Sequence, residues 1–221
     1  MKIRLSEQRG SEKNNWLESK FSFSFADYQD EDWMSFGSLR VLNEDWIAPD
    51  TGFPMHPHRN MEIVTVMLSG ELRHKDSMGN EQSLKSGEIQ AMSTGTGILH
   101  SEWNPQREPA HLYQIWLKPN KCGLEPDYDQ FKPEESDYQV LASGHGNGLK
   151  INSDAEVIRN RLAANQKFTS DAAIYTYVHI ISGEAEIGGV RLKAGDAVGF
   201  EKKEENLKSL TNSELLIIKM Y

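Results

Sequence analysis

The sequence predicts an all-β chain made of two tandem β-barrels of the jelly-roll type. Three observations lead to this expectation. Short apolar segments alternate with turn signals along most of the 221 residues, a spacing typical of barrels and sandwiches. Two short motifs occur twice, in the same order and at nearly the same separation. The chain is also long enough to form two small domains.

In the first half, strands are expected where apolar residues cluster between turns. Phe21, Phe23 and Phe25 alternate with small residues, which is a period-2 signal for a strand. Residues 76–80 (Asp-Ser-Met-Gly-Asn) predict a hairpin turn between two polar strands. Further strands are expected at 63–68, where only Thr65 is polar, at 89–92 and at 111–117.

The second half continues this pattern. Gly188-Gly189 is a strong signal for a two-residue hairpin loop. The segment 154–166 is ambiguous, because its composition favours a helix whereas the internal repeat favours a barrel strand; we expect a strand. Other strands are expected at 177–181, 185–187, 190–192 and 215–220.

The internal repeat defines the domain organisation. Residues 68–71 (Leu-Ser-Gly-Glu) recur as 181–184 (Ile-Ser-Gly-Glu), and 84–88 (Leu-Lys-Ser-Gly-Glu) recur as 192–196 (Leu-Lys-Ala-Gly-Asp). The offsets are 113 residues (68 to 181) and 108 residues (84 to 192). We therefore expect an N-terminal barrel over 1–120, a connecting segment rich in proline and acidic residues over 121–140, and a C-terminal barrel over 141–221.

Composition restricts the surroundings and partners of the chain. The formal net charge of -9 argues against direct binding of nucleic acid, which needs a basic face. The single cysteine, Cys122, allows no intrachain disulfide, as is usual in a reducing compartment. The amino terminus lacks the apolar core of a signal peptide, and no apolar run approaches the ~20 residues of a spanning helix. We expect a cytoplasmic monomer without membrane contact.

Two pairs of residues carry the strongest chemical signal. His56 and His58 flank Pro57, and His100 and Glu102 flank Ser101. In a strand, residues i and i+2 point to the same face, so each pair presents two ligands from one strand. If both strands face the interior of the barrel, three imidazoles and one carboxylate converge. Pro57 is compatible with an edge strand or a strand start.

Such a ligand set suits a divalent transition metal such as iron, manganese, nickel, copper or zinc. The absence of cysteine ligands argues against a structural zinc site. Four protein ligands on an octahedral ion leave two positions open, as dioxygen or a chelating substrate requires. Glu62 has the same strand parity as His56 and His58, so it is a rival ligand, and the chemistry alone does not choose between Glu62 and Glu102.

The sequence resembles the cupins, and within them the pirin-like proteins. Gly52, His56, His58, Glu62 and Gly70 look like the first cupin motif, and Gly87, Gly95, His100 and Asn104 look like the second. The resemblance covers nearly the whole chain and is strongest over residues 21–131. The segments closest to the pirin-like pattern are 27–28, 37–41, 53–59, 62–65, 95–98, 100–102, 114–116 and 125–128. The chain departs from the general cupin pattern at Ser93, where a proline is common, and in two extra residues between Gly95 and His100, which pirin-like proteins share.

The resemblance implies a bicupin whose metal ligands are His56, His58, His100 and Glu102. Glu62 then either supports the ligands from outside the ligand set or has a structural role. The implied activity is that of a quercetin 2,3-dioxygenase, which cleaves a flavonol with dioxygen as co-substrate and releases carbon monoxide. Glu102 would be the catalytic base. Fe(II) is the expected ion, with Zn, Mn, Ni, Cu and Co as alternatives.

A second function is also implied by the resemblance. Eukaryotic relatives are linked to transcription factors, and some bacterial relatives bind metabolic enzymes. The chain would then be a metal-binding regulatory protein that acts through protein partners without catalysis. A cupin isomerase or sugar-binding protein is a third interpretation, which the pirin-like motifs disfavour.

The repeat predicts that only the first barrel binds metal. The positions equivalent to the four ligands fall near Thr169, Asp171, Lys208 and Leu210, which do not form a matching histidine set. We therefore expect about one ion per chain.

The other histidines are expected to have structural or surface roles. His74 is expected to be solvent-exposed in its polar hairpin, His145 to lie on the surface and His179 to belong to the barrel wall. Trp16 is expected to be a packing residue. Phe53 is close to the ligands in sequence, so it is expected in either a pocket wall or the core.

Overall fold

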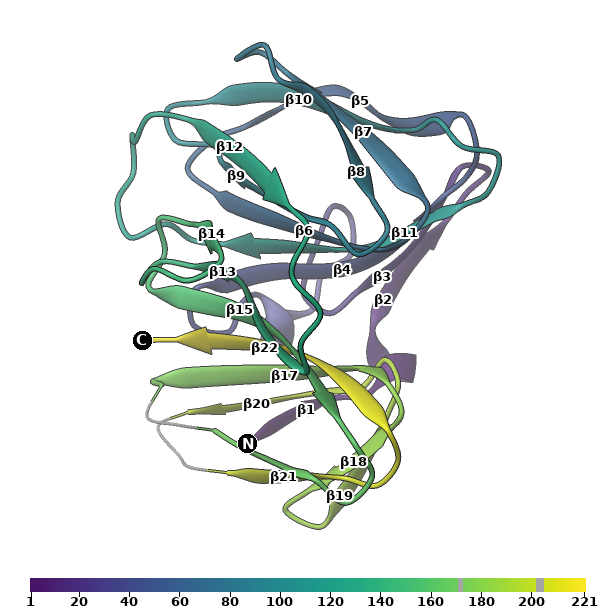
Figure 1. Cartoon of the computed structure of the whole chain (residues 1–221), viewed down its shortest axis with the longest axis vertical. Coiled ribbons are helices and arrows are strands. Elements are labelled where there is room, and N and C mark those ends of the chain that lie inside the picture. The colour runs from purple at the N-terminus through teal and green to yellow at the C-terminus, as the bar shows by residue number, and fades with distance from the viewer. Residues whose placement is uncertain (171–172, 202–204) are drawn as a thin grey trace. The chain divides into compact units, whose positions relative to one another are not determined.

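The computed structural model describes residues 1–170, 173–201 and 205–221 (Figure 1). Asp171 lies outside these ranges. The regular structure is almost entirely strand, with two short 3₁₀ helices, η1 (Ser6–Gln8) and η2 (Glu31–Trp33). Within the described ranges, no helix is long and apolar enough to cross a membrane. The predicted all-β class is confirmed.

The chain divides into two compact units that interleave along the sequence. The N-terminal unit consists of Gly10–Pro133 and Leu149–Ser153. The C-terminal unit consists of Met1–Arg9, Glu134–Gly148 and Asp154–Tyr221. The segment 121–140 therefore contributes residues to both units.

The N-terminal unit contains two antiparallel sheets, with strand orders β12-β9-β6-β11-β4-β3-β2 and β5-β10-β7-β8 (Figure 1). Apolar side chains such as Leu72 and Leu84 fill the interior between them at one end. The strands of this unit are β2 (Gly10–Lys13), β3 (Leu17–Phe21), β4 (Leu39–Ile47), β5 (Thr51–His58), β6 (Glu62–Ser69), β7 (Glu71–Asp76), β8 (Glu81–Lys85), β9 (Ile89–Ser93), β10 (Ile98–Asn104), β11 (Ala110–Leu117), β12 (Asp127–Phe131) and β14 (Leu149–Lys150).

The C-terminal unit has the same plan, with sheet orders β1-β20-β17-β22-β15-β13 and β16-β21-β18-β19. The ambiguous segment at 154–166 forms β15, which confirms the expected strand. The strands are β1 (Lys2–Arg4), β13 (Tyr138–Ser143), β15 (Ala155–Leu162), β16 (Lys167–Thr169), β17 (Tyr175–Ser182), β18 (Glu184–Ile187), β19 (Val190–Lys193), β20 (Ala197–Glu201), β21 (Asn206–Ser209) and β22 (Ser213–Met220).

The repeated sequence motifs adopt the same backbone geometry in both units. Gly70 and Gly183 each join two strands. Their φ angles are 81° and 82°, respectively, a backbone conformation that favours glycine. At the second motif, the N–H of Gly87 donates to the carbonyl of Met67, and the N–H of Gly195 donates to that of Ile180. The predicted tandem of two barrels is thus confirmed.

The strand predicted from the alternation at Phe21–Phe25 is wrong beyond its first residue. β3 ends at Phe21, and Ser22 and Ser24 are buried instead of facing solvent. The N–H of Ser22 donates to the carbonyl of Leu42, and the Ser24 hydroxyl accepts from the N–H of Asp30. The serines therefore hold a loop in place, a use that period-2 alternation alone does not reveal.

Gly52 allows β5 and β10 to approach closely at a register shift between His100 and Glu102. A Cβ at Gly52 would clash with the backbone carbonyl of Glu102 and would lie 2.7 Å from Trp103 Cα. We expect Gly52→Ala to lower the free energy of unfolding by about 2 kcal/mol or more, because backbone must move. Urea unfolding measures this loss.

Gly79→Ala is the matched control for that substitution. Gly79 has a φ of 96°, and a Cβ added there would meet no heavy atom within 4 Å, so only backbone strain of about 1 kcal/mol is expected. Equal losses in the two variants would contradict the steric role of Gly52.

Candidate metal centre

Three neighbouring strands of the sheet β5-β10-β7-β8 each present two ligand-type side chains at positions i and i+2. Backbone pairing aligns them, since His100 lies opposite His56 on one side and opposite Asp76 on the other. Glu102 lies opposite His74. The pairs are His56 and His58 on β5, His100 and Glu102 on β10, and His74 and Asp76 on β7.

The three predicted histidine ligands come together at one end of this array. The ring centroids of His56 and His100 are 4.4 Å apart, those of His56 and His58 are 4.7 Å apart, and those of His58 and His100 are 4.9 Å apart. One nitrogen from each ring lies within 4.8 Å of the other two, so a single ion fits between them. His100 is buried, whereas His56 and His58 are half-buried.

Burial keeps the imidazoles of His58 and His100 neutral, which is the form that binds metal. It lowers the pKa of His58 to about 4, with a further contribution from the neighbouring His56. Burial also lowers the pKa of His100 to about 2, helped by the other histidines. A cation therefore does not have to displace protons from these two rings at neutral pH.

The hydrogen bonds of the histidines also fit a metal site. His56 Nδ1 lies 2.8 Å from the carbonyl oxygen of Pro54, so Nδ1–H donates there and Nε2 is left with its lone pair. Neither ring nitrogen of His100 has a hydrogen-bond partner among the described residues. A buried imidazole without partners is costly, and a metal ion would satisfy one of its nitrogens.

Glu102 lies deeper in the barrel than His56 and His58. Its carboxylate oxygens accept hydrogen bonds from the side-chain amides of Gln90 (2.9 Å) and Gln114 (3.0 Å). Burial, together with the charge of Asp45, raises its pKa to about 7 although both amides act in the opposite direction. A Glu102 carboxylate oxygen lies within 4.8 Å of ligand atoms of His100 and His74. It does not lie within that distance of ligand atoms of His56, His58 and His100 all together.

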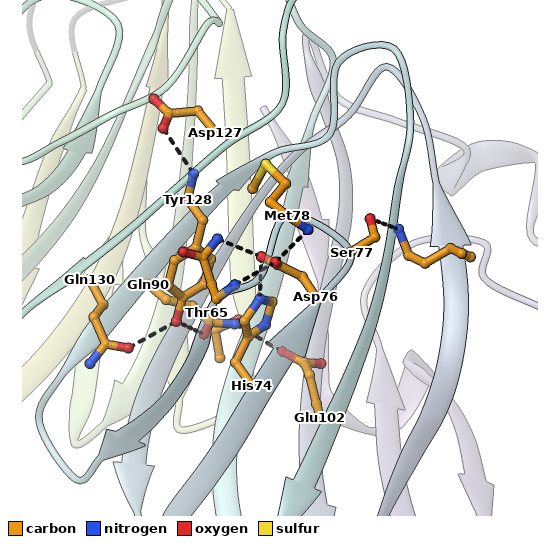
Figure 2. Close-up of polar contacts among 12 residues, drawn as sticks. Thr65, His74, Asp76, Ser77, Met78, Gln90, Glu102, Asp127, Tyr128 and Gln130 are labelled. Carbon is orange, nitrogen blue, oxygen red and sulfur yellow. Dashed lines mark hydrogen bonds and ion pairs between the residues drawn. The ribbon is translucent and has the colours of Figure 1, made fainter.

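A row of polar side chains supports Glu102 from the facing sheet. Cross-strand pairing places Gln114, Thr65 and Gln90 side by side on β11, β6 and β9. The Thr65 hydroxyl donates to Gln114 Oε1. It also accepts from Gln90 Nε2 (Figure 2). The Tyr128 hydroxyl lies 3.0 Å from Gln90 Oε1. These contacts fix the orientation of both amides and hence of the carboxylate.

Gln114→Leu should misorient Glu102 without removing any ligand. We expect the affinity for a divalent metal to fall by roughly 10- to 100-fold, as is usual when a group that orients a ligand is lost. Calorimetric titration with the metal measures this effect. Gln139→Leu, in the C-terminal unit, is the control, and an equal loss there would contradict the orienting role of Gln114.

The affinity for metal should also depend on pH through Glu102. The pKa near 7 means that its carboxyl is protonated below that pH in the absence of metal, and only the carboxylate binds a cation. We expect the apparent affinity to decrease as the pH is lowered through about 7. A Glu102→Gln variant should lose most of this pH dependence. An unchanged dependence of metal affinity on pH in this variant would contradict the role of Glu102.

His74 is not solvent-exposed, so that expectation was wrong. Its ring is fully buried, stacks on Tyr128 at a centroid distance of 4.2 Å, and bonds through Nε2 to Asp76 Oδ2 at 3.0 Å. β7 is one of the strands that wall the barrel, and its residues alternate between interior and solvent. The sequence signal was present in the His-Lys-Asp pattern, which matches the i, i+2 spacing of the other two pairs.

Glu62 faces away from the metal site. Ile63, its neighbour on β6, lines the cavity beside the histidines, so Glu62 points to the opposite face of the strand. There its carboxylate accepts from the Ser93 hydroxyl (2.5 Å) and the N–H of Asn152 (2.8 Å). Burial raises the pKa of Glu62, and these hydrogen bonds act against the increase.

A cavity of about 290 Å³ opens next to the three histidines and Glu102. Five Phe and Trp side chains form part of its wall. Phe53 is one of the wall residues, and Trp16, expected only to pack, is another; their rings meet edge to face at 5.0 Å. The remaining aromatic wall residues, which the sequence did not single out, are Phe21, Phe25 and Trp116.

The remaining histidine predictions are confirmed. His145 is exposed in its loop. His179 is buried in β17 of the C-terminal unit.

The two jelly-roll barrels define a bicupin. Its first barrel carries inward-facing histidines and a carboxylate beside a cavity with aromatic walls, which is a site suited to a metal ion. The sequence profile of the Pirin family matches residues 2–117, and that of the quercetinase C-terminal cupin domain matches residues 140–220. The chain belongs to the pirin family.

Individual relatives agree with this assignment. The chain is 37% identical over 222 residues to quercetin 2,3-dioxygenase of Escherichia coli strain K12, covering 97% of this chain and 96% of that protein. It is 36% identical over 219 residues to a pirin-like protein of Caulobacter vibrioides, covering 95% and 94%. It is also similar to the crystal structure of the bacterial pirin YhhW from Escherichia coli in complex with nickel(II), with a TM-score of 0.94, 35% identity and coverage of 99% and 98%.

Proposed function

We propose that this chain is a metal-dependent dioxygenase that cleaves the ring of a flavonol such as quercetin. His56, His58, His100 and Glu102 would hold one divalent transition-metal ion, with Fe(II) as the expected native ion. The observation that carries the proposal is the position of the aromatic cavity directly beside these side chains. The relatives named as quercetin 2,3-dioxygenases support it.

The cavity suits a flat aromatic substrate. Trp116 meets His58 edge to face at 4.8 Å and Phe25 at 5.5 Å, so an aromatic wall begins at the metal ligands. Such walls bind a planar ring system and exclude water from the reacting atoms. Glu102 and Gln114 are two of the polar groups in the lining, and groups of this kind orient a ligand.

Glu102 is suited to the role of base. A bound divalent ion supplies Lewis acidity, which lowers the pKa of a substrate hydroxyl. Glu102, whose own pKa is raised to about 7, accepts the proton of that hydroxyl at a carboxylate oxygen. The amides of Gln90 and Gln114 hold the carboxylate in place during the transfer. Dioxygen is the co-substrate that reacts with the activated ring.

The test is metal analysis followed by measurement of oxygen uptake. Protein purified without chelator or nickel affinity resin should contain about one divalent ion per chain. With quercetin it should consume dioxygen and release carbon monoxide, lose both activities when the metal is stripped, and regain them on reloading. Fully loaded protein that consumes no dioxygen with any flavonol would overturn the proposal.

One observation favours a second function, a regulatory role through a protein partner. The outer faces of the strands that carry the ligands expose large apolar side chains: Met55 is 50% exposed, Leu99 46% and Trp103 44%. Exposed apolar groups of this kind are typical of interaction surfaces. Recovery of a specific partner from native lysate that is lost in Leu99→Ser/Trp103→Ser, together with no flavonol turnover, would favour this role over catalysis.

A further inference from the structure

The third pair of the array, His74 and Asp76 on β7, has no place in the proposed ligand set. Yet His74 groups with His100 and Glu102, and one ligand atom from each lies within 4.8 Å of the other two. All three side chains are at least 98% buried. His100 and Glu102 are on β10, and His74 is on β7, which pairs with the edge of β10 opposite to β5.

The hydrogen bonds of His74 are those of a metal ligand. Asp76 accepts from the side-chain amide of Asn80 (2.8 Å) and from two backbone N–H groups of the hairpin turn (2.9 and 3.0 Å). Both of its oxygens therefore act as acceptors, Oδ1 for the two backbone N–H groups and Oδ2 for Asn80. As a carboxylate it can only accept, so His74 Nε2 must carry the proton. Nδ1 is then left with a bare lone pair.

That lone pair is otherwise unused. His74 Nδ1 is buried and has no hydrogen-bond partner among the described residues, and the same is true of both nitrogens of His100. The ring cannot turn away, because it stacks on Tyr128 with an interplanar angle of 16° while Asp76 holds its other nitrogen (Figure 2). A carboxylate that fixes the tautomer and orientation of an imidazole is the usual support of a metal-binding histidine.

We propose that His74, His100 and Glu102 form an inner binding position for a divalent transition-metal ion. It shares His100 and Glu102 with the outer position proposed above, in which His56 and His58 complete the ligand set. The inner position offers two imidazoles and one carboxylate, a set known from non-haem Fe(II) sites, whereas the outer position offers three imidazoles and one carboxylate. A neutral imidazole has one lone pair, so His100 serves one ion at a time, and the two positions are alternatives for a single ion.

The inner position rests on the proposed function only because both require the barrel to bind a metal ion. The test below therefore measures metal binding without any substrate. The double variant His56→Ala/His58→Ala removes the outer position. Titrated with Cu²⁺, it should still bind about one ion, and the nitrogen couplings in its electron paramagnetic resonance spectrum should report two imidazoles. Addition of His74→Ala should remove one coupling and weaken binding by at least ~10-fold.

The matched control adds His111→Asn to the same double variant. His111 is half-buried in the same unit and pairs with Glu44 at 3.1 Å, outside both metal positions, so Cu²⁺ binding should not change. Equal binding and equal nitrogen couplings in the His74→Ala triple variant and its double parent would overturn the inner position, whether or not the protein cleaves flavonols.

A second measurement avoids any effect of the His74 substitution on folding. Crystals of the His56→Ala/His58→Ala variant soaked with Co²⁺ should show an anomalous peak between His74, His100 and Glu102. Absence of a peak from this position would overturn the inference. If this peak is present and the unmodified protein shows no flavonol turnover, the inner position stands while the proposed function fails.

Discussion

His100→Ala is expected to reduce the affinity for divalent transition metals by at least ~100-fold, more than the usual effect of losing a group that only orients a ligand. His100 is the one side chain common to both groups of ligand atoms, so its loss affects every arrangement of the ion. Its pKa of about 2 means that it is neutral and available to metal throughout the physiological range. Calorimetric titration of stripped protein measures the change.

His145→Ala is the control for this loss, because His145 is an exposed histidine outside the N-terminal unit. The affinity of the His145→Ala variant for the metal should match that of the unmodified protein. Metal binding by His100→Ala within about tenfold of the original would mean that the ion is held elsewhere, and the proposed ligand set would have to be abandoned.

Glu102→Gln is expected to lower flavonol turnover by at least ~100-fold, which is the usual contribution of a positioned base. The amide keeps the shape of the side chain but can neither accept the substrate proton nor bind a cation as a charged ligand. Three imidazoles remain, so the variant should still bind metal at a saturating concentration. Oxygen uptake with quercetin, measured at full metal loading, separates the loss of the base from the loss of the ion.

Glu62→Gln provides a closely matched control, because Glu62 is a second buried carboxylate in the same barrel. Glu62 faces the opposite side of β6 and accepts hydrogen bonds from Ser93 and Asn152. Flavonol turnover by the Glu62→Gln variant should therefore stay within about threefold of that of the unmodified protein. Loss of turnover in Glu62→Gln with normal turnover in Glu102→Gln would reverse the roles assigned to the two carboxylates.

The sequence was sufficient to predict features that depend on local spacing. The two i, i+2 pairs on β5 and β10 follow from the two-residue period of a strand. The duplicated Gly70 and Gly183 turns follow from the repeat, because each needs a positive φ. Neither inference requires knowledge of which strands pair. The convergence of His56, His58 and His100 needed the further assumption that both strands face the interior of the barrel.

Features that depend on pairing between distant strands could not be predicted in the same way. Gln90, Gln114 and Thr65 each lie between apolar residues in a buried strand, and their meeting depends on registers that join residues 25 to 49 apart in the chain. Their isolated polarity inside buried strands was the available signal. Glu62 shows a related limit, since strand parity does not continue through the turn at Asn60, where φ is 51°.

The position of β5 has a consequence for the solubility of the protein. β5 carries two of the proposed ligands and has only β10 as a partner within its sheet in the described part of the chain, so its other edge has no strand partner there. An open strand of this kind can recruit the same strand of another molecule and start aggregation. Pro54 and Pro57 lack the N–H that such pairing needs. The same segment that brings histidines to the ion is thereby protected against intermolecular β-pairing.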